Sequence, residues 1–209
     1  MKSYPSIFND VIGPVMRGPS SSHCAASLRI GRICRDLMSE KINHILIEFD
    51  PKGSLATTHK SQGSDMGLFG GFLGWEAFDE RLPESERYIN LAGIKVEIEI
   101  LDIGASHPNT YRITLSNKEE SRRMTAISTG GGMIEVISID GAEVSMAGDF
   151  CETLIYCKSP ESLLPFLKES LDYDELSVHS GDLPFIEIKS QRFPDTAICQ
   201  ELMATGQVL

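Results

Sequence analysis

The stretch IKVEIEIL, residues 94–101, alternates apolar and charged side chains from Ile94 to Ile100. A period of two residues is typical of a half-buried β-strand, because successive side chains of a strand point to opposite faces of the sheet. Similar segments follow it, separated by turn residues: TYRITLS, RRMTAIST, MIEVISI and AEVSMAG. We therefore expect an antiparallel meander from Ile94 to about Gly148, with Asp140-Gly141 as a two-residue hairpin turn.

Helical patterns dominate the residues before this meander. From Ser20 to about Lys41, apolar residues recur at helical spacing and predict a helix with one buried face. HILIEFD, residues 44–50, predicts a short strand, and the polar ESERYINLAG, residues 84–93, predicts a connector. SDMGLFGGFLGW, residues 64–75, contains four glycines. Glycine is costly inside a helix, so we expect a helix that another element approaches closely, with a loop as the alternative.

Beyond Asp149 the pattern is strand, helix, strand, strand and helix, and the final GQVL has the composition of the start of a strand. This order resembles a small regulatory domain of the ACT type, which has a ferredoxin-like fold. The fold class is therefore α+β, with a first domain over residues 1–148 and an ACT-like domain over residues 149–209.

Composition narrows the classes of function. The chain has 209 residues, 41% of them hydrophobic and 23% charged, which is ordinary for a globular protein with a real core. A formal net charge of −11 argues against a nucleic-acid binder and against adhesion to an anionic membrane. The N-terminal residues have no sustained apolar stretch of the secretory kind, and no segment approaches the length of a membrane span. We expect a cytoplasmic protein.

The five cysteines are irregularly spaced, and the closest pair, Cys151 and Cys157, is separated by five residues. Metal and iron–sulfur sites normally show closer spacing, such as C-x-x-C, so we expect no metal ligands in this chain. We interpret the cysteines as small buried side chains, with Cys24 as a possible exception.

Polar residues gather at the start of the first predicted helix. A single serine would cap a helix after Gly18-Pro19, but three are present: Ser20, Ser21 and Ser22. Hydroxyls and free N–H groups at the positive end of a helix dipole suit a carboxylate or a phosphate, and His23 adds a donor or an acid–base group. The alternative is an ordinary helix with more capping groups than it needs.

Three further clusters carry chemistry-bearing residues. In HPNTYRI, residues 107–113, His107 precedes a proline at the start of a strand, and Asn109 can both donate and accept hydrogen bonds. In SQGSD, residues 61–65, Asp65 either caps the next helix or belongs to a site with Gln62. The triple glycine Gly130, Gly131 and Gly132 predicts a bulge or sharp bend, or a backbone that a ligand approaches closely.

Together these clusters resemble the β chain of the iron–sulfur-dependent L-serine dehydratases. GPSSSHCAA is similar to that family's G-P-S-S-S-H-T opening, and GSLATTHKSQGSDMGLFGGFLG to its G-S-[LF]-A-x-T-x-x-G-H-G-T-D segment and glycine-rich helix. HPNTYRI and STGGGMIEV are similar to its H-P-N-[TG] strand and S-[IV]-G-G-G-x-I turn. The resemblance covers about Pro5 to Gly148, and four motifs occur in the same order.

The resemblance implies a sheet with helices like the allosteric substrate-binding domain of some phosphoglycerate dehydrogenases. It implies an oligomer with an α chain whose cysteines hold a [4Fe–4S] cluster, the Lewis acid for the β-hydroxyl of serine. It also implies a small amino-acid substrate, with Ser20, Ser21, Ser22 and His23 as the carboxylate receptor. His107 and Asn109 would orient the substrate or assist proton transfer, and residues 130–132 would allow close backbone approach.

One departure matters for the chemistry. Gln62 stands where the family has the histidine of G-H-G-T-D, and glutamine does not relay protons at neutral pH. His59, three residues earlier, is a candidate replacement. Three interpretations stay open: a serine dehydratase with its base elsewhere, a dehydratase for another small β-hydroxy acid, or a non-catalytic module that senses amino acids or anions.

Overall fold

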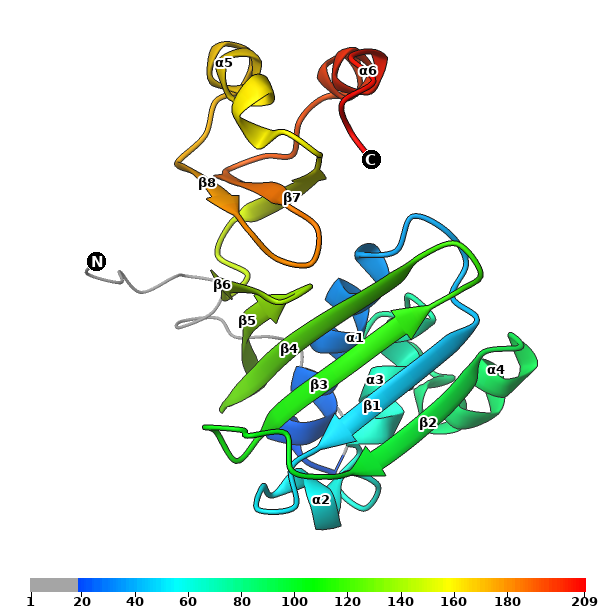
Figure 1. Cartoon of the computed structure of the whole chain (residues 1–209). Coiled ribbons are helices and arrows are strands. Elements are labelled where there is room, and N and C mark those ends of the chain that lie inside the picture. The colour runs from blue at the N-terminus through cyan, green and yellow to red at the C-terminus, as the bar shows by residue number, and fades with distance from the viewer. Residues whose placement is uncertain (1–18) are drawn as a thin grey trace.

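The computed structural model describes residues 19–209, and its larger part is a mixed sheet of six strands (Figure 1). The strands lie in the order β2-β1-β3-β4-β5-β6. Their bounds are β1 (His44–Phe49), β2 (Lys95–Ile100), β3 (Thr110–Ser116), β4 (Ser121–Gly130), β5 (Met133–Ile139) and β6 (Ala142–Met146). Residues 1–18, which begin the predicted first domain and include Arg17 and Gly18, lie outside the described residues.

The meander is shorter than the sequence predicts. Strands β3 to β6 pair antiparallel in sequence order, but β2 pairs parallel with β1 at the far edge of the sheet. A parallel pair needs a long crossover, and residues 50–94 supply it. The predicted polar connector in this crossover is wrong: it contains α4 (Ser85–Leu91), preceded by a 3₁₀ turn, η3 (Leu82–Glu84). The buried side chains of Leu82 and Ile89 anchor it.

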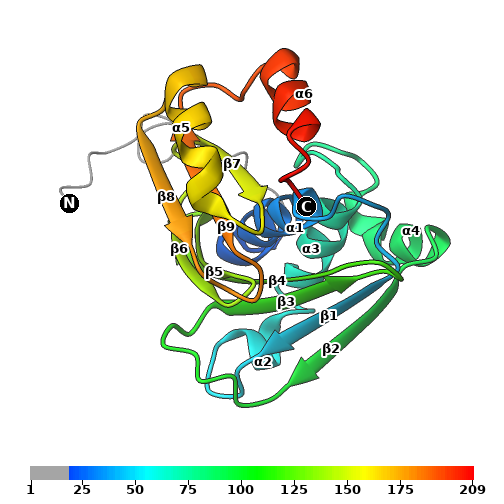
Figure 2. The same ribbon diagram turned by 45° about the horizontal axis from the view of Figure 1, so that its top comes forward.

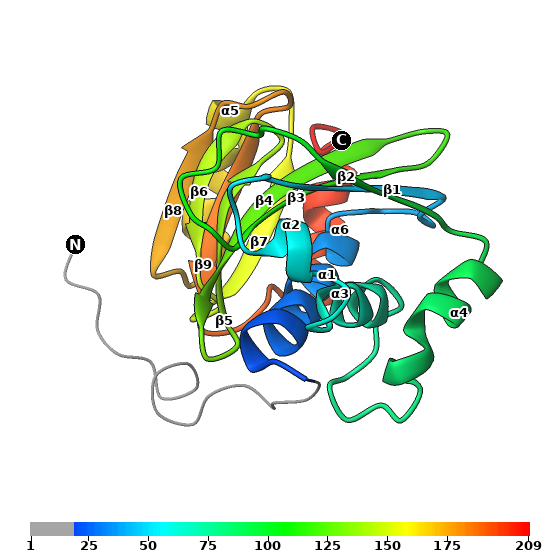
Figure 3. The same ribbon diagram turned by 90° about the horizontal axis from the view of Figure 1, so that it is seen from below.

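One face of the sheet is covered by helices, as Figure 3 shows. They are α1 (Ala26–Asp36), which continues a π-helical turn, η2 (Ser21–Ala25), together with α3 (Ser64–Phe72) and α4; the short α2 (Leu55–Thr58) follows β1. Helix α1 ends five residues before the predicted Lys41. The backbone N–H groups of Ser39 and Glu40 bond to Oε1 of Glu120 at 2.9 and 3.1 Å instead of continuing the helix.

The glycine-rich segment is a helix that packs unusually close to α1. A Cβ atom on Gly71 would lie 2.4 Å from the carbonyl oxygen of Leu28, and one on Gly67 would lie 2.3 Å from that of Cys24. On the other side of the crossing, a Cβ on Gly31 would lie 2.6 Å from the carbonyl oxygen of Leu68. The predicted close approach is confirmed, and it fixes where the start of α1 lies relative to α3.

The smaller part is a three-stranded antiparallel sheet in the order β7-β9-β8. It comprises β7 (Cys151–Tyr156), α5 (Pro160–Ser170), β8 (Glu175–His179), β9 (Phe185–Ser190) and α6 (Thr196–Ala204), which is the order that the sequence predicts. The chain then returns beside β7 through a single antiparallel bridge between Val208 and Cys157. Figure 2 shows α5 and α6 beside this small sheet.

The two sheets share part of one hydrophobic core, to which Tyr156 and Phe185 of the smaller part contribute. The hydroxyl of Tyr156 donates to Oδ2 of Asp140 at 2.8 Å, and the N–H of Asp182 donates to the Asp140 carbonyl at 2.7 Å. Asp140 and Gly141 have φ angles of 47° and 79°, which confirms the hairpin turn. This turn is the point at which the smaller sheet docks.

The cysteines only partly match the expectation of burial. All five are free thiols; Cys24, Cys34 and Cys157 are buried, Cys151 is half-buried and Cys199 is exposed. Cys199 lies on α6, where only Leu202 is buried. Most of this helix is therefore at the surface, and the thiol of Cys199 is exposed with it. None of the helices among residues 19–209 has the length and apolar character needed to cross a membrane.

Candidate functional site

The strand directions bring several of the predicted site residues to one end of the strands of the larger sheet, which we call the site edge. Here β1 and β4 end while β3 begins, because Thr110 pairs with Ile127 and Glu48 pairs with Arg112. The N–H of Ser128 donates to the Asn109 carbonyl at 3.0 Å across this edge. Helix α2 lies against the same edge, below the ends of β1 and β3 in Figure 1. Segments far apart in the sequence therefore meet here.

The start of the first helix forms a hydrogen-bonded chain instead of a simple cap. The hydroxyl of Ser20 lies 3.0 Å from Nδ1 of His23, and Nε2 of His23 lies 3.5 Å from Oγ1 of Thr58. The Thr58 hydroxyl itself donates to the Ser54 carbonyl at 2.5 Å, so its oxygen is placed to accept a hydrogen bond from Nε2–H of His23. His23 is 9% exposed, and burial lowers its pKa, which favours the neutral ring. The side chains of Ser21 and Ser22 lie outside what the structure describes.

His107 and Asn109 are held by their own turn and by Ser54. Nδ1 of His107 accepts the Asn109 backbone N–H at 3.1 Å, so the neutral ring carries its proton on Nε2 and presents a donor. The Ser54 hydroxyl donates to Oδ1 of Asn109, and the Ser54 N–H donates to the Pro108 carbonyl at 2.9 Å. This arrangement leaves the amide N–H groups of Asn109 available as donors.

Asp65 pairs with a histidine and does not cap α3. The N-cap residue of α3 is Gly63, with φ 85°, and no side chain caps the helix. Oδ1 of Asp65 lies 2.7 Å from Nδ1 of His59, and both side chains are mostly buried, at 14% and 21% exposure. Burial raises the pKa of Asp65, and the hydrogen bond to His59 offsets part of that rise. The ring of His59 packs 5.3 Å from that of Phe49.

Gln62 lies between these two residues in the turn that joins α2 to α3. Its backbone N–H donates to the Thr58 carbonyl at 2.9 Å, and its side chain is half-buried. No hydrogen bond joins its amide group to any other part of residues 19–209. His59 lies outside the family motif, so the motif does not identify it as a site residue. The feature of the sequence that indicates its pairing with Asp65 is their spacing of six residues across a turn that contains Gly63, which has a left-handed conformation.

The triple glycine forms the turn between β4 and β5, at the site edge. Residues 130, 131 and 132 have φ angles of 107°, 60° and 79°, which glycine adopts at little cost. A Cβ atom on Gly130 or Gly131 would meet nothing within 4 Å, so the backbone conformation and not close packing requires glycine. Nη1 of Arg29 donates to the Gly132 carbonyl at 3.1 Å and ties this turn to α1.

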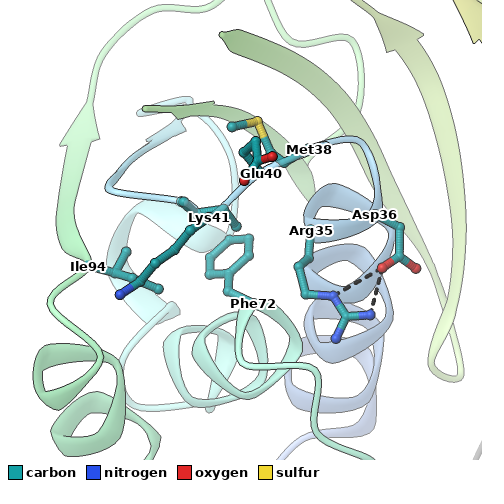
Figure 4. A pocket seen from close by; sticks show the side chains of 8 residues that line it. Arg35, Asp36, Met38, Glu40, Lys41, Phe72 and Ile94 are labelled. Atoms are coloured by element: carbon teal, nitrogen blue, oxygen red, sulfur yellow. Dashed lines mark hydrogen bonds and ion pairs between the residues drawn. The ribbon is translucent and has the colours of Figure 1, made fainter. Parts of the chain in front are cut away.

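Two cavities lie away from the site edge. The larger, about 470 Å³, is lined by Arg35, Lys41, Phe72 and Ile94 among others, where α1 ends and β1 and β2 begin (Figure 4). A second, about 390 Å³, lies along α1 between Arg29 and Phe78. Among residues 19–209 no group of three or more histidine, cysteine or acidic side chains could hold a metal ion.

Comparison with known proteins gives two similar sequences. No protein-family model matches the chain. It is 40% identical over 152 residues to the probable L-serine dehydratase, beta chain, of Bacillus subtilis, a match that covers 73% of this chain and 68% of that protein. It is 30% identical over 173 residues to the L-serine dehydratase, beta chain, of Peptoniphilus asaccharolyticus, covering 82% of this chain and 77% of that protein.

Proposed function

The chain belongs to the family of L-serine dehydratase β chains, and we propose that it supplies the substrate-binding edge of a two-chain L-serine ammonia-lyase. The enzyme converts L-serine to pyruvate and ammonia. The substrate would lie at the site edge, between the start of the first helix and the turns that carry Asn109 and Gly131.

One observation carries this proposal: a continuous chain of hydrogen bonds joins three of the four motif segments. It runs from Ser20 through His23, Thr58 and Ser54 to Asn109. These residues come from the helix start, from α2 and from the turn before β3, and no packing of apolar side chains requires hydroxyl, imidazole and amide groups in this sequence. A network of this kind rigidifies a surface whose remaining donors then face outward.

The remaining donors suit an amino-acid carboxylate. Asn109 offers its amide N–H groups, His107 offers Nε2–H, and the first N–H groups of a helix that begins at Ser21 point out of its N-terminus. All of these donors are neutral, so they bind a carboxylate without a basic surface and agree with a chain of net charge −11. The donor role of His107 favours substrate orientation over removal of a proton.

The described residues do not offer a ligand set for a [4Fe–4S] cluster. Such clusters are held by cysteine thiolates, and here the buried thiols Cys24, Cys34 and Cys157 come from separate elements. We therefore place the cluster on the cysteines of a partner α chain, and the site edge is the surface that this partner would cover. The share of this chain is to bind and orient the substrate and to exclude water from it.

The division into domains at residues 148 and 149 and the ACT-like assignment belong to the same proposal. The order β7-β9-β8, with Val208 beside the outer edge of β7, supports a ferredoxin-like arrangement whose last strand is reduced to one bridge. Because this unit docks on Asp140 and not on the site edge, its proposed role is regulatory and not catalytic.

Anaerobic co-expression of the chain with a cysteine-rich α chain tests the function. The expected result is a brown complex that forms pyruvate from L-serine. The absence of a complex would refute the subunit assignment. A brown complex that is inactive on L-serine but active on another small β-hydroxy acid would redirect the substrate. A chain that binds amino acids but forms no active complex would be a sensor.

A further inference from the structure

We propose that His59 is the general base of this enzyme and that Asp65 is the residue that positions it. The inference rests on the proposed function, since it concerns the removal of the α-proton of L-serine. It assigns to this chain a role beyond substrate binding.

The geometry of the pair fixes which nitrogen is free. Nδ1 of His59 lies 2.7 Å from Oδ1 of Asp65, and because an ionised carboxylate only accepts hydrogen bonds, the proton lies on Nδ1. Nε2 is then left with a lone pair that can take a proton, the arrangement that orients a base histidine. The ring packs on Phe49, and the His59 carbonyl accepts the N–H groups of Ser64 and Asp65 at 2.8 and 3.3 Å. The side chain is therefore held in one orientation.

The other two histidines at the site edge carry the opposite tautomer. Nδ1 of His107 accepts the Asn109 backbone N–H, which puts the ring proton on Nε2. In His23, Nδ1 faces the Ser20 hydroxyl and Nε2 faces the Thr58 oxygen, so both nitrogens are engaged. Neither ring leaves a free lone pair for the substrate.

The remaining histidines lie elsewhere. His44 begins β1 at the opposite end of the sheet, with Nε2 3.3 Å from Glu97, and His179 lies on β8 with Nε2 2.7 Å from Glu187. Since the chain contains five histidines in all, His59 alone combines a carboxylate on Nδ1 with a place at the site edge.

Nε2 of His59 takes the α-proton of L-serine, the electron pair of the Cα–H bond becomes the Cα–Cβ double bond, and the β-hydroxyl leaves with the Cβ–O pair. The proton on His59 then neutralises the hydroxide to water. The products are 2-aminoacrylate and a neutral histidine, and hydrolysis of the imine tautomer of 2-aminoacrylate gives pyruvate and ammonia.

Charged neighbours of the pair come from several elements. Lys60 beside it and Glu86 on α4 act on the Asp65 carboxylate with opposite signs, and burial raises its pKa. Tyr111 on β3 contacts the Ser64 hydroxyl at 3.3 Å, and His23 reaches the same region through Thr58. Of these groups, only Asp65 contacts a ring nitrogen of His59, which is Nδ1.

The test uses the complex with the α chain and five variants. His59→Gln should lower kcat by about 100-fold or more with KM changed less than about threefold, since general base catalysis contributes about 10²–10⁴-fold. Asp65→Asn should lower kcat by about tenfold, and Asp65→Glu should restore part of it. His44→Gln, the matched control, should leave both constants unchanged. Gln62→His should not raise turnover appreciably; a large increase would show instead that the missing histidine limits the reaction.

A second readout does not depend on turnover. The ¹⁵N NMR shifts of the His59 ring in the full chain should show a protonated Nδ1 and an unprotonated Nε2, and Asp65→Asn should lose this pattern. A proton on Nε2 in the unsubstituted chain, or full activity of His59→Gln, would overturn the inference. An unsubstituted complex that is inactive on L-serine would instead overturn the proposed function.

Discussion

The crossing of α1 and α3 predicts a large effect of a single methyl group at Gly71. In Gly71→Ala the new Cβ would lie 2.4 Å from the Leu28 carbonyl oxygen, 2.8 Å from the Arg32 nitrogen and 2.8 Å from Cα of Gly31. All three atoms belong to the backbone of α1, so no rotamer change relieves the contact. The two helices must separate along their whole crossing.

The expected loss of stability follows from two opposing terms. Overpacking a core costs about 1–3 kcal/mol, and a rigid backbone contact belongs at the upper end or above it. Alanine recovers about 1 kcal/mol of helix propensity relative to glycine. We expect a net loss of about 2 kcal/mol, which lowers the Tm of a chain of this size by about 4–8 °C.

Gly70→Ala is the matched control on the same helix. Its Cβ would come within 2.3 Å of Cδ1 of Leu82, which is the far end of one side chain and not backbone, so the expected loss of stability is smaller, within about 1 kcal/mol. Urea unfolding of the full chain, followed by circular dichroism, measures both variants. If Gly71→Ala is as stable as Gly70→Ala, the close helix crossing is not the constraint that the structure indicates.

Two further predictions concern the junction of the two sheets. Burial, with a contribution from Glu187, raises the pKa of Glu152 from its ordinary 4.5 to about 7; the protonated form is therefore favoured by folding, and this stabilisation is present below about pH 4.5 and lost as the pH rises through 7. The free energy of unfolding should therefore fall between pH 5 and 8, and in Glu152→Gln this fall should be smaller by about 1–2 kcal/mol, a value that allows for the partial exposure of the side chain. Urea titrations at several pH values measure it, and an unchanged pH dependence would contradict the prediction. Tyr156→Phe removes the 2.8 Å hydrogen bond to Asp140 while keeping the ring under Arg122, and should cost about 1–3 kcal/mol in the same assay, whereas a neutral effect would contradict a structural role for this bond.

Local patterns in the sequence predicted the type and position of most elements, but they did not predict which elements lie side by side. Alternation identified β3 to β6 and the Asp140-Gly141 turn, because both signals are local. The parallel placement of β2 beside β1 depends on a long crossover, and α4 was hidden because its buried side chains, Ser85 and Ile89, are few among polar residues. Neither property is visible in a window of a few residues.

The prediction of the candidate site was also correct in part. The sequence predicted which segments carry site residues, since hydroxyl, histidine and glycine clusters stand out by composition. It did not predict the partners: the three serines were expected to cap the helix or to receive a carboxylate, whereas the Ser20 hydroxyl faces His23, and Asp65 bonds to His59 and does not cap α3. Both pairings join residues that are close in the sequence, but they depend on the π-helical turn at the start of the first helix and on the left-handed turn at Gly63, which composition does not predict.

The central claim is that the site edge binds the carboxylate of L-serine, and steady-state kinetics of the two-chain enzyme test it most directly. Asn109→Ala removes a donor at this edge, and Ser121→Ala, an exposed serine at the opposite end of the sheet, is the control. A hydrogen bond to a charged group is worth about 1.5–3 kcal/mol, so the KM for L-serine should rise about tenfold or more in Asn109→Ala and stay constant in Ser121→Ala. An unchanged KM in Asn109→Ala, with the complex intact, would contradict the claim.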